Sequence, residues 1–431
     1  MGRVNYGYMG RYLLTLSARY DGSSRLAEGH KWVLFPSAAL AWRISDEPFM
    51  KDLVWLDNLK LRVGYGKTGN SAVSPYQTKG QLALRHYVFN NGSSEYIGYA
   101  PSVMANDQLT WETTDQWNVG VDFGFLKNRI NGTVEFYLQN TKDLLLKRQL
   151  PVVSGFSSVM SNVGSTRNKG IEITLNTRNI MNRNFSWSTD LTFSANKEEI
   201  VELYNGKTDD VGNLWFIGQP IDVYYNYKKI GIWQNTENDL AEMAKFNEKG
   251  ANFKPGSIRL EDVDGDYKIT EEDKQILGSV RPKFVASMVN NFEFKGFDLS
   301  VFLYASVGGL LRNNIEFMEK PGRGNTVKVD YWTPTNPTNA FPRPSVDVEK
   351  LDYISTLGYD KADFLRIRNI TLGYTLPEMW SKKVLMDKIR IYLSANNPAI
   401  FTNFTGIDPE GANGRTAPSY STWMFGINLS M

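Results

Sequence analysis

The chain has 431 residues, with 48 Lys and Arg against 46 Asp and Glu and a formal net charge of +2. It has no Cys and only 2 His, which excludes a disulfide framework, a thiol nucleophile and Cys-based zinc sites and leaves little room for His-based metal catalysis. The near-neutral charge also argues against nucleic-acid binding, which normally requires a basic surface.

The first residues, Met1–Tyr8, have neither the basic start nor the apolar core of a secretory signal, which taken alone predicts a cytoplasmic protein. Residues 4–20, however, already alternate, with Val4, Tyr6 and Leu14 among the apolar side chains of one face. We therefore expect a fragment of a longer protein, without its signal and its N-terminal region.

Period-two alternation recurs along the whole chain and predicts an all-β fold. In residues 115–124, Trp117, Val119 and Val121 share one face and the polar side chains share the other. No apolar run reaches 18 residues, so a membrane role would require a β-barrel rather than a helix. The pattern predicts about twelve strands, near residues 4–20, 32–45, 58–68, 115–124, 130–140, 169–177, 185–196, 283–294, 297–306, 363–376, 388–396 and 420–431.

The connections between these strands alternate in length. Short ones at 46–57, 125–129, 178–184, 295–296 and 377–387 alternate with longer ones, of which 69–114, 197–282 and 307–362 are the longest. Outer-membrane barrels show this asymmetry, with tight periplasmic turns and long outer loops, whereas a soluble sandwich has no reason to keep its long loops on one side. The sequence therefore predicts a transmembrane antiparallel β-barrel over residues 1–431.

Two further segments have a clear pattern. Residues 238–246, inside the longest loop, combine an Asn/Asp cap signal with helical spacing of apolar residues and predict a short helix. Residues 422–431 alternate up to the carboxyl end, which is typical of a barrel that closes on its last strand.

Several motifs occur in a fixed order along the chain. They are YLLTLSARYDGS (12–23), LKLRVGYGKTGN (59–70), NKGIE (168–172), DVDGD (262–266) with ILG (276–278), FKGFDLS (294–300), YWTPTNP (331–337), FLRIRNITLGY (364–374), YLSANN (392–397) and GIDPE (406–410). Together they resemble the barrel region of SusC/RagA-type TonB-dependent outer-membrane transporters of Bacteroidetes.

This resemblance implies a 22-stranded barrel with a plug in its lumen, of which about twelve strands and no plug correspond to the C-terminal part. It implies import of a nutrient such as an oligosaccharide or oligopeptide across the outer membrane. The implied partners are a SusD-like surface lipoprotein, outer-membrane lipid and the TonB complex, which would act through the missing N-terminal part. One departure is Met431, because the terminal residue of outer-membrane barrels is commonly aromatic.

An acidic segment over residues 262–273 has the spacing of oxygen ligands for Ca²⁺. Asp262, Asp264, Asp266 and Asp273 take positions 1, 3, 5 and 12 of a calcium loop. Tyr267 stands where the sharp turn favours Gly, and Asp273 is shorter than the usual bidentate Glu. A surface loop stabilised by Asx-turns explains the same residues. Both interpretations stay open, and any ion here is expected to be structural.

Aromatic residues in the predicted loops are candidates for contact with a sugar, a peptide or a lid protein, and we single out Trp111, Trp233 and Trp332. The paired carboxylates Asp209-Asp210 and Glu271-Glu272 are adjacent, so they point apart in an extended chain and do not suit glycoside hydrolysis. We therefore predict a protein that is not an enzyme. The alternative is a soluble all-β glycan-binding module or glycoside hydrolase.

Overall fold

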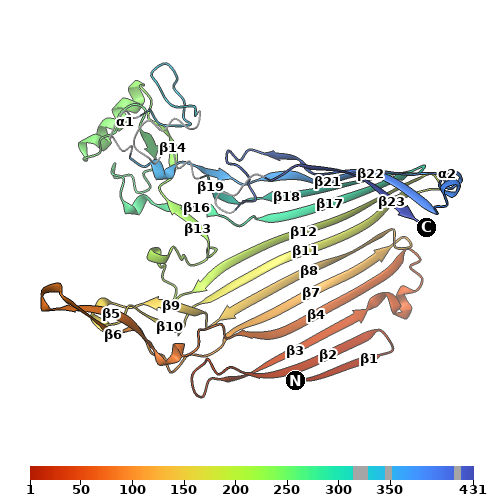
Figure 1. Cartoon of the computed structure of the whole chain (residues 1–431), viewed down its shortest axis with the longest axis horizontal. Helices are drawn as coiled ribbons and strands as arrows, with labels where there is room; N and C mark the ends of the chain where they lie inside the picture. Colours follow the sequence, from red (N-terminus) through yellow and green to blue (C-terminus); the bar gives the residue numbers. More distant parts are fainter. Residues whose placement is uncertain (314–328, 345–351, 412–418) are drawn as a thin grey trace.

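The computed structural model describes residues 1–313, 329–344, 352–411 and 419–431. Within them, thirteen long strands form one curved antiparallel sheet in chain order, as expected for part of a barrel wall (Figure 1). The strands are β1 (Gly2–Tyr8), β2 (Tyr12–Gly22), β3 (Trp32–Arg43), β4 (Leu56–Asn70), β7 (Glu112–Phe125), β8 (Ile130–Lys142), β11 (Ser165–Met181), β12 (Phe185–Glu202), β17 (Phe284–Phe294), β18 (Phe297–Val307), β21 (Phe364–Thr375), β22 (Lys388–Thr402) and β23 (Thr422–Ser430).

The single strand predicted over residues 4–20 is wrong, because these residues form the hairpin of β1 and β2. Met9 and Gly10 adopt positive φ values of 52° and 67° and turn the chain, so that Tyr8 pairs with Tyr12. A three-residue turn keeps even-numbered residues on the same face of both strands. The apolar alternation therefore continues through the turn without a break, and the sequence count was one strand short.

The predicted asymmetry of the connections is confirmed. Figure 1 shows the tight turns at one end of the sheet and the long connections at the other, which we call the short-turn end and the long-loop end. Residues 314–328 and 345–351 of the predicted 307–362 loop lie outside the described residues, as do residues 412–418 of the connection before β23.

The strand register separates an apolar face of the sheet from a polar face. Leu61 on β4 pairs with Val121 on β7, which pairs with Val134 on β8, so the three share one face. Rings flank this apolar face at both ends. At the short-turn end Tyr12 stacks on Trp42 at 6.3 Å, and at the long-loop end Tyr20 stacks on Trp32 at 5.3 Å. Aromatic girdles of this kind mark the two interfaces of a membrane barrel.

The helices are few and short. α1 (Glu237–Glu248) confirms the helix predicted in the longest loop, although Thr236, whose side chain accepts from the Asp239 amide, is its N-cap. α2 (Glu378–Ser381) lies in the turn before β22. Among the described residues, no helix has both the length and the apolar character needed to span a membrane.

The long connections build their own small sheets. One contains β5 (Gln81–Phe89), β6 (Ser94–Met104), β10 (Ser158–Asn162) and β9 (Leu145–Gln149), in that order. Three further sheets of the described residues have two strands each: β13 (Val223–Asn226) with β16 (Gln275–Ser279), β14 (Lys229–Ile232) with β15 (Ile258–Leu260), and β19 (Leu310–Arg312) with β20 (Tyr359–Lys361).

The hydrophobic clusters of the described residues lie mainly at the long-loop end. One surrounds Leu109 and Trp111, and two others surround Ile232 and Trp233. The apolar face of the long sheet, in contrast, exposes large side chains such as Val119 and Phe136. A soluble sandwich buries that face against a second sheet, so the soluble alternative is wrong in its architecture.

Val119→Arg is expected to cost about 2–4 kcal/mol of barrel stability, because residue 119 lies mid-strand on the lipid face and is 40% exposed. The matched control is Asn118→Arg, one residue away on the polar face, which is expected to cost much less. The measurement is the temperature at which the detergent-solubilised protein loses its folded mobility in SDS gels. Equal losses in both variants would contradict the assignment of faces.

Candidate functional site

Charged side chains on the polar face meet across several strands. Arg62 on β4 donates to the carboxylate of Asp122 on β7, at 3.0 Å from Nε and 2.8 Å from Nη2, and also pairs with Glu135 on β8. Gly120 on β7 lies in the row between Arg62 and Glu135, and a Cβ there would be 2.9 Å from Arg62 Nη2. The glycine therefore leaves room for an ion pair that spans three strands.

A second ion pair crosses the polar face near the short-turn end. Arg390 on β22 donates from Nε to Asp298 on β18 at 2.8 Å, passing over Gly373 on β21. Beside it is an open pocket of about 710 Å³, whose lining includes Lys388 and Glu293. This part of the wall is polar and carries both signs of charge, as expected for a surface that faces water or another polar surface.

The most buried ion pair of the described residues joins two of the motifs quoted above. Arg366 of the FLRIRN motif donates to Asp408 of the GIDPE motif at 2.7 Å, and their side chains are only 4% and 5% exposed. Arg366 Nε also lies 3.0 Å from Glu410, which pairs with Arg368 as well. The connection before β23 is thereby tied to the wall at β21.

Asp408 is held in its charged form by its neighbours. Burial alone would raise the pKa of the Asp408 carboxyl, but hydrogen bonds from the Ser419 hydroxyl, the Glu410 amide and Arg366 outweigh it and lower that pKa. A pocket of about 400 Å³ lies beside this cluster, lined by Tyr304 and Phe364 among others. Rings and charges thus meet at the long-loop end of the wall.

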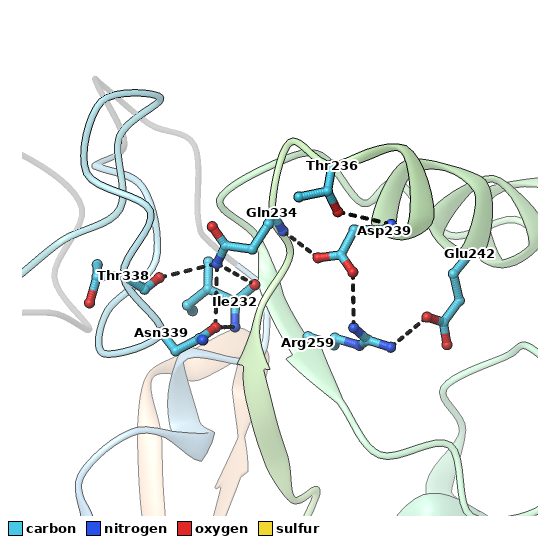
Figure 2. A network of polar contacts seen from close by, with 8 residues as sticks. All are labelled: Ile232, Gln234, Thr236, Asp239, Glu242, Arg259, Thr338 and Asn339. Atoms are coloured by element: carbon cyan, nitrogen blue, oxygen red, sulfur yellow. Dashed lines mark hydrogen bonds and ion pairs between the residues drawn. The ribbon is translucent and has the colours of Figure 1, made fainter.

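The longest connection folds into a small domain around α1. Trp233 is 1% exposed and packs against Phe246 and Phe253, with ring centroids 5.9 and 6.0 Å away. The guanidinium of Arg259 lies 4.4 Å above the Trp233 ring. Figure 2 shows Arg259 between Asp239, at 3.2 Å, and Glu242, both on α1, so the helix is fixed to β15 by charge as well as by apolar contact.

A second set of polar contacts in Figure 2 attaches residues 329–344 to the same domain. Gln234 donates from Nε2 to the backbone oxygens of Ile232 and Thr338, at 2.8 and 3.3 Å. Asn339 Oδ1 accepts from the Ile232 amide at 3.0 Å, and Trp332 donates from Nε1 to Gln234 Oε1 at 2.8 Å. Segments about 100 residues apart thus form one unit.

The three loop aromatics singled out as candidates for contact with a ligand or a lid protein are buried. Trp111 is buried in the cluster around Leu109 and donates from Nε1 to the Lys31 carbonyl at 2.9 Å. Trp233 and Trp332 are buried in the small domain just described. Long loops need cores of their own, and large aromatic side chains are what fills them. Tyr96 and Tyr99, also in the predicted loops, are exposed.

The structure brings together three of the four predicted metal ligands. One oxygen from each of Asp262, Asp264 and Asp273 lies within 4.8 Å of the others, whereas Asp266 is outside this group. Asp273 is fully buried and accepts from the amides of Val263 and Thr270, at 2.8 and 2.7 Å.

Backbone amides also reach the other carboxylates of this loop. Asp262 accepts from Gly265 at 2.8 Å, and Asp266 accepts from Lys268 at 2.7 Å. The Asp266 amide lowers the pKa of Asp264, but burial and the nearby carboxylates outweigh it and raise that pKa. Tyr267 takes the left-handed conformation, with φ of 62°, at the place where the calcium loop favours Gly. Asx-turns and a metal site both remain consistent with this arrangement.

Comparison with known proteins identifies the family. The family model described as "TonB dependent receptor-like, beta-barrel" matches residues 1–397. TonB-dependent receptor P3 of Formosa agariphila is 34% identical, over 99% of this chain and 45% of its own length. TonB-dependent receptor SusC of Bacteroides thetaiotaomicron is 32% identical, over 99% of this chain and 43% of its own. The chain thus spans less than half the length of these relatives.

A solved structure agrees with these matches. The structure of the RagAB peptide transporter includes a chain that is 26% identical, with a TM-score of 0.80, over 99% of this chain and 47% of that one. The resemblance to SusC and RagA inferred from the motifs is confirmed. Residues 1–431 belong to the TonB-dependent receptor-like β-barrel family, whose barrels lie in the outer membrane.

Proposed function

We propose that this chain takes part in TonB-dependent import of a nutrient, an oligopeptide or oligosaccharide, across the outer membrane. The observation that carries the proposal is a wall with an apolar outer face, a polar inner face and folded loops at one end. A polar lumen lets a hydrated solute pass, while the ordered loops offer a surface to capture it. The similar RagAB complex is described as a peptide transporter.

We also propose that a SusD-like lipoprotein covers the long loops. The support is the β5–β6 hairpin, which projects from the loops in Figure 1 and exposes apolar side chains on both faces. Leu84 and Tyr99 pair on one face, and Tyr87 and Tyr96 pair on the other. Beyond the contact of β6 with β10 at Val103 and Met104 the hairpin has only two strands, which are marginally stable in water, and exposed apolar patches of this kind mark protein contacts.

We propose no catalytic role for this chain. The carboxylates of the Asp209-Asp210 pair are both used within the loop, since Asp209 accepts from the Ile217 amide at 2.7 Å and Asp210 accepts from the Asn213 amide at 3.1 Å. Two carboxylates so engaged do not face each other across a bond to be cleaved. The relatives reported above are receptors or transporters.

Uptake measurements test the proposed import. Cells of the source bacterium with and without the intact gene would be given labelled oligopeptides and labelled oligosaccharides separately. Loss of uptake of one class, restored by the gene and abolished by collapsing the energy supply to TonB, is the expected result. Unchanged uptake of both classes would contradict the proposal.

We further propose that the 262–273 loop binds Ca²⁺ as a structural ion through Asp262, Asp264 and Asp273. Added Ca²⁺ is expected to slow protease cleavage of the loop, because an ion that binds only the folded loop stabilises it. Asp264→Asn should abolish that protection, whereas the control Asp266→Asn, outside the oxygen cluster, should retain it. Cleavage at equal rates in Ca²⁺ and in chelator would show that Asx-turns alone hold the loop.

A further inference from the structure

The apolar face of the sheet carries a small group of polar side chains near its short-turn end. Thr177 on β11, Thr189 on β12 and Asn290 on β17 are direct partners in the strand register, so they share one row. That row lies on the apolar face, because Ile173, four residues before Thr177, pairs with Val134 of the apolar row described above. We call this group the polar island.

Apolar side chains surround the polar island on every side. They are Ile130 and Val301 in the same row, Leu191 and Met288 in the next row toward the middle of the sheet, and Trp187 and Phe292 in the next row toward the short turns. The rings of Trp187 and Phe292 stack at 5.6 Å. The island is therefore an isolated polar spot on a surface that the membrane covers.

A β-bulge adds a fourth polar side chain, that of Asn179. The register of β11 against β12 shifts between Arg178 and Ile180, so that Ile180 lies opposite Trp187 and Asn179 is the extra residue. Asn179 Oδ1 accepts from the Thr177 hydroxyl at 3.0 Å, and its Nδ2 donates to the Thr189 hydroxyl at 2.8 Å. Bulges redirect side chains, and this one completes a hydrogen-bonded chain that leads to Asn290.

The hydrogen bonds at Asn290 fix which way its amide points. Trp187 Nε1 and the Thr189 hydroxyl both donate to Asn290 Oδ1, at 3.1 and 2.7 Å. An indole N–H can only donate, so the atom that faces it is the oxygen. Within the described residues, the two hydrogens of Asn290 Nδ2 have no acceptor. This nitrogen is not buried by the protein, so an acceptor can reach it from the membrane side.

The depth of the island in the membrane indicates what that acceptor is. Neighbouring rows on one face are about 6.6 Å apart along a strand, and a tilt of about 45° places Asn290 about 5 Å nearer the membrane centre than Trp187. Tryptophan rings lie at the level of the lipid headgroups. Just inside that level are the glycerol esters of the phospholipids, whose carbonyl oxygens accept hydrogen bonds and cannot donate them.

A cation is held beside the island on the side of the short turns. Arg129, in the turn before β8, donates from Nε to the carbonyl oxygen of Arg178 at 3.2 Å and from Nη2 to that of Asn179 at 2.7 Å. The guanidinium is thereby fixed next to the bulge. A lipid phosphate lies farther from the membrane centre than its glycerol esters, which is the direction in which Arg129 lies.

We propose that the polar island binds one phospholipid of the periplasmic leaflet, with a glycerol-ester carbonyl oxygen accepting from Asn290 Nδ2 and the phosphate beside Arg129. A lipid is the occupant because the island is continuous with the face that already lies in the membrane. An amide without an acceptor is strongly unfavourable in hydrocarbon, and the ester satisfies it. This site concerns the membrane and not the nutrient, so it goes beyond the proposed import.

Lipids with and without ester carbonyls test the assigned bond. Full-length protein in detergent would be titrated with ester-linked phosphatidylglycerol and with its ether-linked analogue, and the first bound lipid followed by native mass spectrometry. The wild-type protein is expected to bind the ester lipid about two- to tenfold more tightly, the value of one net hydrogen bond. Equal affinities in the wild-type protein, as expected if water satisfies Asn290, overturn the proposal.

Two variants assign the effect to the island. Asn290→Leu is expected to bind both lipids equally and as weakly as the wild-type protein binds the ether lipid. The matched control is Asn291→Leu, one residue away on the polar face, which should keep the wild-type preference. A preference retained in Asn290→Leu overturns the proposal.

A photo-crosslinking amino acid in place of Val301, the neighbour of Asn290 in the row, distinguishes a lipid from a protein partner in cells. An adduct with the mass of a phospholipid is expected. An adduct with a second protein would show that a protein covers the island and would also overturn the proposal.

Discussion

Arg366→Met is expected to loosen the connection before β23 by about 3–5 kcal/mol, because it leaves the buried Asp408 carboxylate without its cation. Methionine fills much of the same volume, so the loss comes mainly from charge. Asp408 keeps its hydrogen bonds from the Ser419 hydroxyl and the Glu410 amide, which favour the ionised carboxylate although its side chain is only 5% exposed. An uncompensated buried charge is among the most destabilising single changes in a protein.

The effect is measured as protease cleavage within the connection between β22 and β23 in the detergent-solubilised protein. If local opening precedes cleavage, about 3–5 kcal/mol corresponds to a rise in cleavage rate of roughly two to three and a half orders of magnitude. Arg368→Met is the matched control, because Arg368 is more exposed, its ion pair among the described residues is with Glu410, and losing that pair should cost under about 1 kcal/mol. Similar rates for both variants would show that Arg366 does not hold the connection.

The long sheet could be predicted because a barrel wall places every second side chain in lipid, so one face is apolar over most of each strand. The alternation continues through the hairpin at Met9 and Gly10, so the sequence pattern of the two strands is that of a single strand. Length gives no separate signal for the turn, because β11 is a single strand of 17 residues in the same sheet.

The candidate site was less predictable, because its contacts join residues far apart in the chain. The sequence shows both the motif that contains Arg366 and the motif that contains Asp408. Their separation of 42 residues, however, gives no indication that the two side chains form an ion pair. The burial of the loop aromatics could not be predicted for a related reason. A tryptophan in a long loop has the same local sequence whether it faces a ligand or a small core, and Trp233 and Trp332 turn out to face cores.

Trp233→Ala is expected to cost the small domain about 3–5 kcal/mol, the range found when a buried Trp or Phe is truncated to Ala. The ring contacts Phe246 on α1 and Phe253 after it, and it also supports the Arg259 guanidinium. Its removal leaves a cavity between helix and sheet. Arg259 keeps its carboxylate partners on α1 but loses the ring beneath it, and the remaining apolar contacts of the helix are those of Phe246 with Phe253 and Tyr267.

Hydrogen exchange of the α1 amides measures this loss, since opening of the domain exposes them. Trp233→Phe is the matched control: it keeps an apolar ring and removes the indole Nε1, which is buried without a hydrogen-bond partner among the described residues, so its cost should be much smaller. The barrel should unfold at the same temperature in both variants, because the domain has a separate core. If α1 keeps its protection in Trp233→Ala, the ring is not what holds the helix in place.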